Sequence, residues 1–179
     1  MPFVGAGAGA AAAAFDKALC ASALVAAGFP TLRAALVEGK NDGSFPSRSD
    51  VHKKLTAWFA DESLDPERAW VVVKPCGGGS SLGVSAARGV DEAADAATAL
   101  LGGFETETAE SFRNSPRPTR VLVERHAGGG AEFTVVVVET ARGPVALAPT
   151  EVEVFPSAEG ADERDRVFDF RAKYLPSSR

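Results

Sequence analysis

The chain has few of the residues from which several common kinds of site are built. Among its 179 residues there are only two cysteines, Cys20 and Cys76, and two histidines, His52 and His126. Two isolated cysteines have neither the close spacing of a metal-binding motif nor enough partners for a disulfide framework. Neither histidine is paired in the sequence with a nucleophile. A structural zinc site, a disulfide scaffold and a histidine-activated nucleophile are therefore not indicated.

Long apolar runs and basic clusters are also missing. No run approaches the roughly 18–20 apolar residues that span a bilayer, and the Ala-rich opening at 6–14 has no basic region before it. Lys and Arg number 19 against 24 Asp and Glu, giving a net charge of -5. No stretch combines dense Lys/Arg with aromatic residues. We expect a cytoplasmic protein, or one of an organelle stroma if a transit peptide precedes it, with no nucleic-acid or membrane partner.

The most informative pattern that is present runs from Trp70 to Val84. An apolar run leads to Lys74, Pro75 ends the strand because it has no N–H to donate, and a glycine- and serine-rich loop follows at 76–83. Such a loop brings backbone N–H groups and hydroxyls close to an anion, and a neighbouring lysine adds positive charge. The pattern predicts a phosphate-binding loop, with a plain Gly/Ser hairpin as the alternative. It is not a P-loop, because the lysine precedes the glycines.

Helices and strands are both predicted along the chain. The predicted helices are 15–28, 50–59 and 91–101, and the predicted strands are 70–74, 82–85, 120–124, 132–139 and 145–154. In the second helix Val51, Leu55 and Phe59 share one face, and Asp50 and Asp91 are the expected N-caps. Because helices and strands do not alternate strictly, the order favours an α+β or mixed α/β fold over a doubly wound parallel sheet.

Charged residues at the ends of apolar runs complete the pattern: Glu124, Glu132 and Lys173. With the glycine loop, they lie in five segments that resemble, in order, the D-alanine–D-alanine ligase family of ATP-grasp enzymes. The segments are Pro2-Phe-Val-Gly with Phe15-Asp-Lys-Ala-Leu and Ala27-Gly-Phe-Pro-Thr; Val73-Lys-Pro with Gly79-Ser-Ser-Leu-Gly-Val; Val121-Leu-Val-Glu-Arg; Glu132-Phe-Thr-Val; and Phe168-Asp-Phe-Arg-Ala-Lys-Tyr-Leu. The resemblance covers nearly the whole chain apart from 31–68 and 102–118.

The resemblance implies an ATP-grasp fold, in which two α+β subdomains clamp a nucleotide. Residues 1–124 would form the central subdomain, with the phosphate loop at 76–83. Residues 125–179 would begin the C-terminal subdomain and end after the mobile ω-loop. We expect the sequence to be a segment that lacks the family's N-terminal domain and the C-terminal half that holds its metal ions.

The resemblance also implies roles for residues around the phosphates of ATP. Lys17 and Lys74 would hold the α- and β-phosphates, and Ser80 and Ser81 would lie in the loop that covers them. Ser80 and Tyr174 would form a hydrogen-bond network near the first D-alanine, and are the catalytic candidates.

Further roles concern the nucleoside and the γ-phosphate. Glu124 would accept a hydrogen bond from the adenine amino group, and Glu132 would bind the ribose hydroxyls. Lys173 would close over the γ-phosphate with the ω-loop. The backbone along the purine edge would come from Arg125, His126 and Ala127.

The implied reaction joins two D-alanines through an acyl phosphate and releases ADP and phosphate. The expected ligands are ATP and D-alanine or a similar small amino acid, and family members are often homodimers. Mg²⁺ is expected for the family, but we assign it no ligand in this sequence. Three alternatives stay open: a non-catalytic nucleotide-binding remnant, another ATP-grasp carboxylate–amine ligase, and a variant that uses D-lactate or D-serine.

Overall fold

A computed structural model describes residues 5–39, 43–102, 117–128 and 130–152. The helices are α1 (Ala8–Phe15), α2 (Lys17–Ala26), α3 (Arg48–Asp61) and α4 (Gly89–Gly102). The strands are β1 (Ala34–Glu38), β2 (Trp70–Pro75), β3 (Ser85–Arg88), β4 (Arg120–Arg125), β5 (Glu132–Thr134), β6 (Val137–Thr140), β7 (Gly143–Ala146) and β8 (Thr150–Val152).

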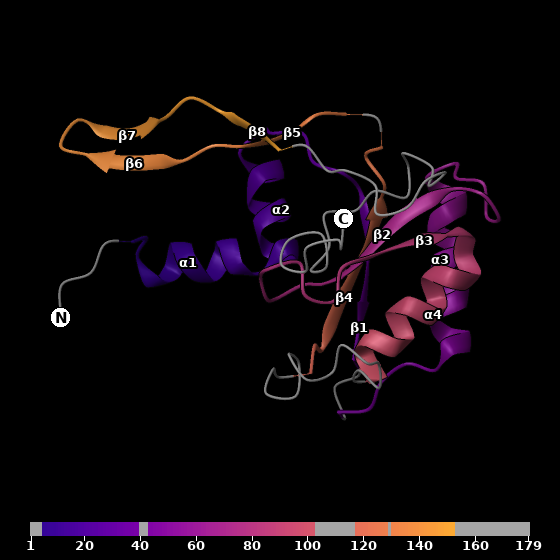
Figure 1. Cartoon of the computed structure of the whole chain (residues 1–179). Coiled ribbons are helices and arrows are strands. Elements are labelled where there is room, and N and C mark those ends of the chain that lie inside the picture. The colour runs from indigo at the N-terminus through magenta and orange to yellow at the C-terminus, as the bar shows by residue number, and fades with distance from the viewer. Residues whose placement is uncertain (1–4, 40–42, 103–116, 129, 153–179) are drawn as a thin grey trace, which may run out of the picture.

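The centre of the fold is a four-stranded antiparallel sheet with the strand order β1-β4-β2-β3 (Figure 1). Side chains alternate between its two faces, and one face packs against α3 and α4. On this inner face Val71, Val73, Val121 and Val123 are all 0% exposed. The strands predicted at 70–74 and 120–124 are therefore confirmed.

Helix α3 presents the predicted apolar face to this core, since Val51, Leu55 and Phe59 are its buried residues. Its N-cap was predicted wrongly. Ser47 is the cap, and the hydroxyl of Ser47 accepts from the Asp50 N–H at 3.1 Å while Asp50 Oδ2 accepts from the Ser47 N–H at 3.1 Å. Asp50 thus completes a capping box from the first turn.

Helix α4 begins two residues before its predicted cap, Asp91. Gly89 opens it with φ +71°, and a Cβ at this position would lie 2.6 Å from the carbonyl oxygen of Pro66. Only glycine fits this backbone and this close approach.

A single N-terminal helix was predicted over 15–28, but the structure has two helices here, α1 and α2, on either side of Asp16. They are bent by 105° at Asp16, whose Oδ1 accepts from the N–H groups of Ala18 and Leu19, each at 3.0 Å. Asp16 is therefore the N-cap of α2. In the part of the chain that the structure describes, no single helix is long and apolar enough to cross a membrane. The bent pair of α1 and α2 together has the length and composition that a membrane span needs.

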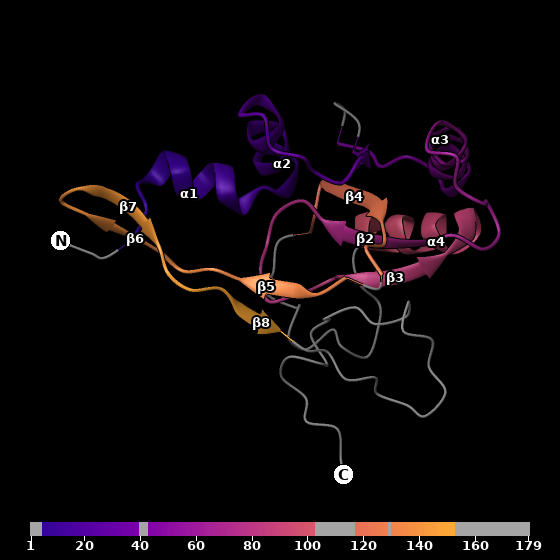
Figure 2. The same ribbon diagram turned by 90° about the horizontal axis from the view of Figure 1, so that it is seen from above.

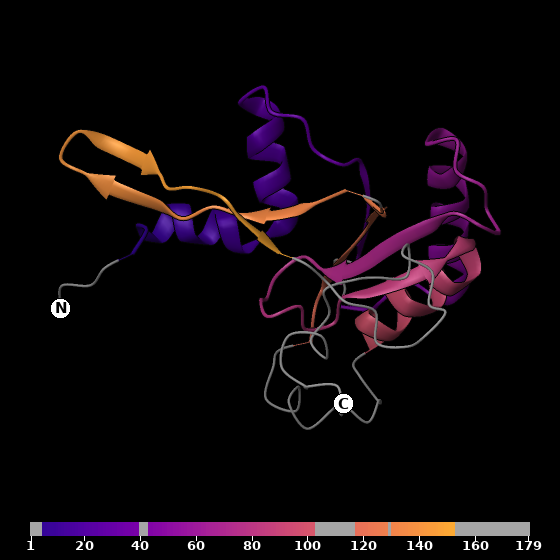
Figure 3. The same ribbon diagram turned by 45° about the horizontal axis from the view of Figure 1, so that its top comes forward.

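Strand boundaries also differ from the prediction after the glycine loop. Residues 81–83 form a turn, so β3 begins at Ser85 rather than at Leu82. The strand expected over 132–139 is divided into β5 and β6, which pair with β8 and β7 respectively. The β6–β7 hairpin extends away from the four-stranded sheet on the same side as α1 (Figures 2 and 3).

The mixed α+β class is confirmed. The division into subdomains at residues 124 and 125 stays a prediction. Residues 153 and 154 of the last predicted strand lie outside the described residues.

The only cysteine in the core of the described residues is Cys76, which follows β2 and is 2% exposed. Burial raises the pKa of its thiol to about 11. At pH 8 only about one thiol in a thousand would be ionised at that pKa, and the thiolate is the nucleophile.

We therefore predict that iodoacetamide at pH 8 alkylates the half-buried Cys20 far faster than Cys76. Peptide mass spectrometry of the two sites at timed intervals would measure both rates. In denaturant the two rates should become similar, which is the control. Equal rates in the folded protein would contradict the burial of Cys76.

Candidate functional site

The charged residues of the four-stranded sheet gather on its outer face, which we define as the face turned away from α3 and α4. Strand alternation places Val72 and Lys74 of β2 and Leu122 and Glu124 of β4 on this face. In the register, Lys74 lies opposite Leu122 and Val72 opposite Glu124. Lys74 and Glu124 are thus diagonal neighbours, within reach of each other.

Lys74 and Glu124 form an ion pair between Nζ and Oε1. Their side chains are 20% and 18% exposed, so water screens the pair only partly. The pair holds the Lys74 ammonium group against β4 on the outer face of the sheet. It joins two residues that the sequence placed in separate parts of a nucleotide site.

Lys17, the first residue of α2, reaches the same loop. Its backbone N–H donates to the Cys76 carbonyl at 2.8 Å, and its Nζ donates to the Gly78 carbonyl at 3.1 Å. Burial and the nearby Lys74 ammonium group lower the pKa of Lys17. The two lysines predicted to act together are therefore brought together by the fold.

The loop itself has an unusual backbone conformation. Ser80 and Ser81 lie in the left-handed region with φ of 55° and 53°, and Gly78 and Gly83 have φ of 96° and 72°. Left-handed non-glycine residues are costly and concentrate at ligand-binding sites. We call Lys17, Lys74, Glu124 and residues 76–83 the glycine-loop site.

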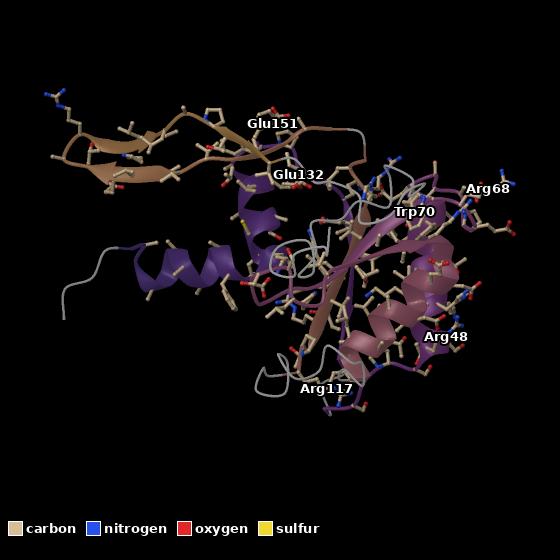
Figure 4. All side chains as sticks on the ribbon, viewed as in Figure 1. Arg48, Arg68, Trp70, Arg117, Glu132 and Glu151 are labelled. Carbon is tan, nitrogen blue, oxygen red and sulfur yellow. The ribbon has the colours of Figure 1, made fainter. Side chains whose placement is uncertain are left out.

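The other predicted site residues are not part of the glycine-loop site as defined here. Arg125 ends β4, and the His126 N–H donates to the Trp70 carbonyl at 3.2 Å, followed by the exposed Ala127. Glu132 is exposed on β5, outside the four-stranded sheet, where it lies opposite Val152 of β8 (Figure 4). The ion pairs of the described residues do not join it to the glycine-loop site. The predicted residues Lys173 and Tyr174 lie outside the described part of the chain.

Sequence reasoning missed a second charged cluster beside this site. Arg120 Nη1 donates to Asp16 Oδ2 at 2.8 Å, and Arg120 Nε donates to Glu38 Oε1 at 3.1 Å. Only Asp16 gave a signal in the sequence, because it is a capping residue type directly before Lys17.

Within residues 5–39, 43–102, 117–128 and 130–152, no group of three or more His, Cys, Asp or Glu side chains could hold a metal ion. The described residues therefore do not fit a magnesium site, and we derive no reaction step through one.

No model of a known protein family matches the chain. In sequence the chain is 28% identical over 179 residues to the D-alanine–D-alanine ligase of Bifidobacterium adolescentis, a match that covers 99% of the chain and 43% of that ligase. The chain thus spans well under half the length of this curated relative.

Two solved structures share the fold. D-alanyl-alanine synthetase A from Vibrio cholerae matches with a TM-score of 0.60 and 20% identity over 90% of this chain and 42% of that one. The D-alanine–D-alanine ligase from Coxiella burnetii matches with a TM-score of 0.58 and 21% identity over 89% of this chain and 39% of that one. The likeness confirms that the mixed α+β fold corresponds to part of these structures. With the sequence match, it confirms the resemblance to the D-alanine–D-alanine ligase family of ATP-grasp proteins that the motifs indicate, over about 40% of the length of those proteins.

Proposed function

We propose that the glycine-loop site binds the phosphates of ATP for a carboxylate–amine ligation of the D-alanine–D-alanine ligase type. One observation carries the proposal: Lys17 of α2 donates from its ammonium group to the glycine loop, and the Lys74 ammonium group, at the end of the strand that leads into the loop, lies near it. Only the Glu124 carboxylate forms an ion pair with either of them among the described residues.

The electrostatics of the site favour a bound anion. Lys74 lies close enough to Lys17 to lower its pKa, although Glu124 and Asp16 act in the opposite direction. A phosphate between the two ammonium groups would offset their repulsion and would raise the pKa of Lys17 again. Charge-assisted hydrogen bonds from both lysines would then hold the α- and β-phosphates.

The glycine loop supplies the second part of the proposal. Residues with left-handed backbone at 78, 80, 81 and 83 turn the chain tightly over a short distance. A glycine-rich turn of this kind allows backbone N–H groups to approach an anion closely. The hydroxyls of Ser80 and Ser81 would add donors above the phosphates.

In the proposed reaction, a carboxylate oxygen of D-alanine attacks the γ-phosphorus of ATP. The bond from that phosphorus to the bridging oxygen breaks, ADP leaves and an acyl phosphate forms. The amine of a second D-alanine then attacks the acyl carbon, loses a proton and displaces phosphate, which forms the peptide bond. In this scheme Lys17 and Lys74 neutralise charge that grows on the leaving ADP.

The remaining residues have assisting roles in the proposal. Glu124, held by Lys74, would accept from the adenine amino group, with the backbone of the next three residues along the purine edge. Ser80 and Tyr174 would position the first D-alanine, and Lys173 would close over the γ-phosphate.

Lys74→Met should weaken ATP binding by about 1.5–3 kcal/mol, which is roughly a 10- to 150-fold rise in Kd, because a charged hydrogen bond is lost. Inorganic tripolyphosphate should lose affinity by a similar factor, since Lys74 would contact phosphate. Isothermal titration calorimetry of both ligands measures this, with the exposed Lys54→Met on α3 as the matched control. Equal affinity in wild type and Lys74→Met, or no ATP binding to the wild type, would contradict the proposal.

Glu132→Gln should weaken ATP binding but leave tripolyphosphate binding unchanged. The reason is that its carboxylate would bond the ribose hydroxyls, which tripolyphosphate lacks. The same calorimetry separates the two effects, and Glu139→Gln on the exposed strand β6 is the control. A variant that loses affinity for both ligands, or for neither, would remove Glu132 from the ribose site.

A further inference from the structure

Arg120 connects three separate elements beside the glycine-loop site. It is the first residue of β4 and lies opposite Glu38, the last residue of β1. Its guanidinium donates to Glu38 through Nε and to Asp16, the cap of α2, through Nη1. The Arg120 side chain is 31% exposed and that of Asp16 is 21% exposed, whereas Glu38 is 51% exposed. The contact with Asp16 is therefore the better shielded of the two.

Asp16 uses both carboxylate oxygens in this arrangement. Oδ1 accepts from the N–H groups of Ala18 and Leu19, and Oδ2 accepts from Arg120. The guanidinium thus holds the Asp16 carboxylate in the position that caps α2. Lys17 is the next residue, so its backbone position depends directly on this cap.

A second path from Arg120 to Lys17 runs through the backbone. The Arg120 carbonyl accepts from the Cys76 N–H at 3.0 Å, and the Cys76 carbonyl accepts from the Lys17 N–H at 2.8 Å. With the side-chain contact to Asp16, these bonds close a ring through Arg120, Cys76, Lys17 and Asp16. The ring ties the start of α2 to the start of the glycine loop.

We propose that Arg120 is a positioning residue of the glycine-loop site, which acts through Asp16 to hold Lys17 against the loop. This inference rests on the proposed function for the identity of the ligand, the phosphates of ATP. Arg120 itself need not touch the nucleotide.

The charge on Arg120 has a further effect in this scheme. Asp16 lies near enough to Lys17 to raise its pKa. Without the guanidinium, Asp16 Oδ2 would lose its partner and become an acceptor for the neighbouring ammonium group of Lys17. That contact would draw Nζ away from the Gly78 carbonyl, to which it now donates. Arg120 keeps the carboxylate and the ammonium group apart by occupying the carboxylate.

Arg120→Met tests the proposal, and Glu38→Gln is its matched control. Both variants remove the ion pair between β1 and β4, but only Arg120→Met removes the contact with Asp16. Hydrogen exchange of individual amides, read by NMR, measures the hold on Lys17, because its N–H donates to the Cys76 carbonyl. Amides in the middle of α3 give the reference for any change in global stability.

In Arg120→Met, the Lys17 and Cys76 amides should exchange at least about tenfold faster relative to the α3 amides, and in Glu38→Gln they should change less than about twofold. Asp16→Asn should give a smaller increase, because its amide oxygen still caps the helix but no longer pairs with a charge. This second variant keeps the test decisive if Arg120→Met does not fold. Unchanged Lys17 exchange in the folded variants would overturn the proposal.

Calorimetry on the same proteins separates this proposal from the function on which it rests. Arg120→Met should weaken ATP binding about tenfold through misplacement of Lys17, while Glu38→Gln should bind as the wild type does. Faster Lys17 exchange in a protein whose wild type binds no ATP would contradict the proposed function and leave the positioning role standing. Normal ATP affinity in Arg120→Met would overturn the positioning role alone.

Discussion

The ammonium group of Lys17 contacts the glycine loop and lies near that of Lys74, and the rest of the site follows from how the fold holds these two like charges. Like charges at short distance repel, and burial adds a desolvation cost that appears in the lowered pKa of Lys17. The fold offsets this cost with the Glu124 carboxylate beside Lys74 and the Gly78 carbonyl beside Lys17. A polyanion would offset the remaining repulsion, which is why we propose that the site binds the phosphates of ATP.

The sheet produces this arrangement through the different use of its two faces. Valines of β2 and β4 fill the inner face against α3 and α4, so the intervening side chains must lie on the outer face. Lys74, Glu124 and Arg120 are among them. Because β2 and β4 are antiparallel neighbours, the start of β4 lies beside the end of β2, where the glycine loop begins. Arg120 and Cys76 meet at this edge.

The sequence predicted those helices and strands whose apolar residues form a recognisable pattern within the element itself. The strands around Lys74 and Glu124 are short apolar runs rich in valine, and α3 has its apolar residues at helical spacing, so both were predicted. Strand β1 was not predicted, since Ala34–Glu38 is short and has only one β-branched residue. The bend at Asp16 was missed because the alanines on either side favour a continuous helix, while the partner of the second Asp16 carboxylate oxygen, Arg120, lies far along the chain.

In the site, too, the sequence predicted local features but not contacts between residues that are far apart in the chain. Lys17, Lys74 and the loop were found from residue type and resemblance, but the Lys74–Glu124 contact spans 50 positions and the Arg120–Asp16 contact spans 104. Such contacts depend on strand register, which no local pattern specifies. Ser80 and Ser81 were expected in the loop, yet their left-handed backbone was not, because neither is a residue type that favours it.

The central claim is that Lys17, Lys74 and the glycine loop together bind the phosphates of ATP. Titration of the ¹⁵N-labelled chain with ATP, followed by the chemical shifts of individual backbone amides, tests it most directly. Our account predicts that the largest shifts occur at residues 76–83 and at Lys17, and that tripolyphosphate reproduces them. Saturable shifts centred on other residues, or no shifts at the loop at ATP concentrations that saturate binding, would contradict it.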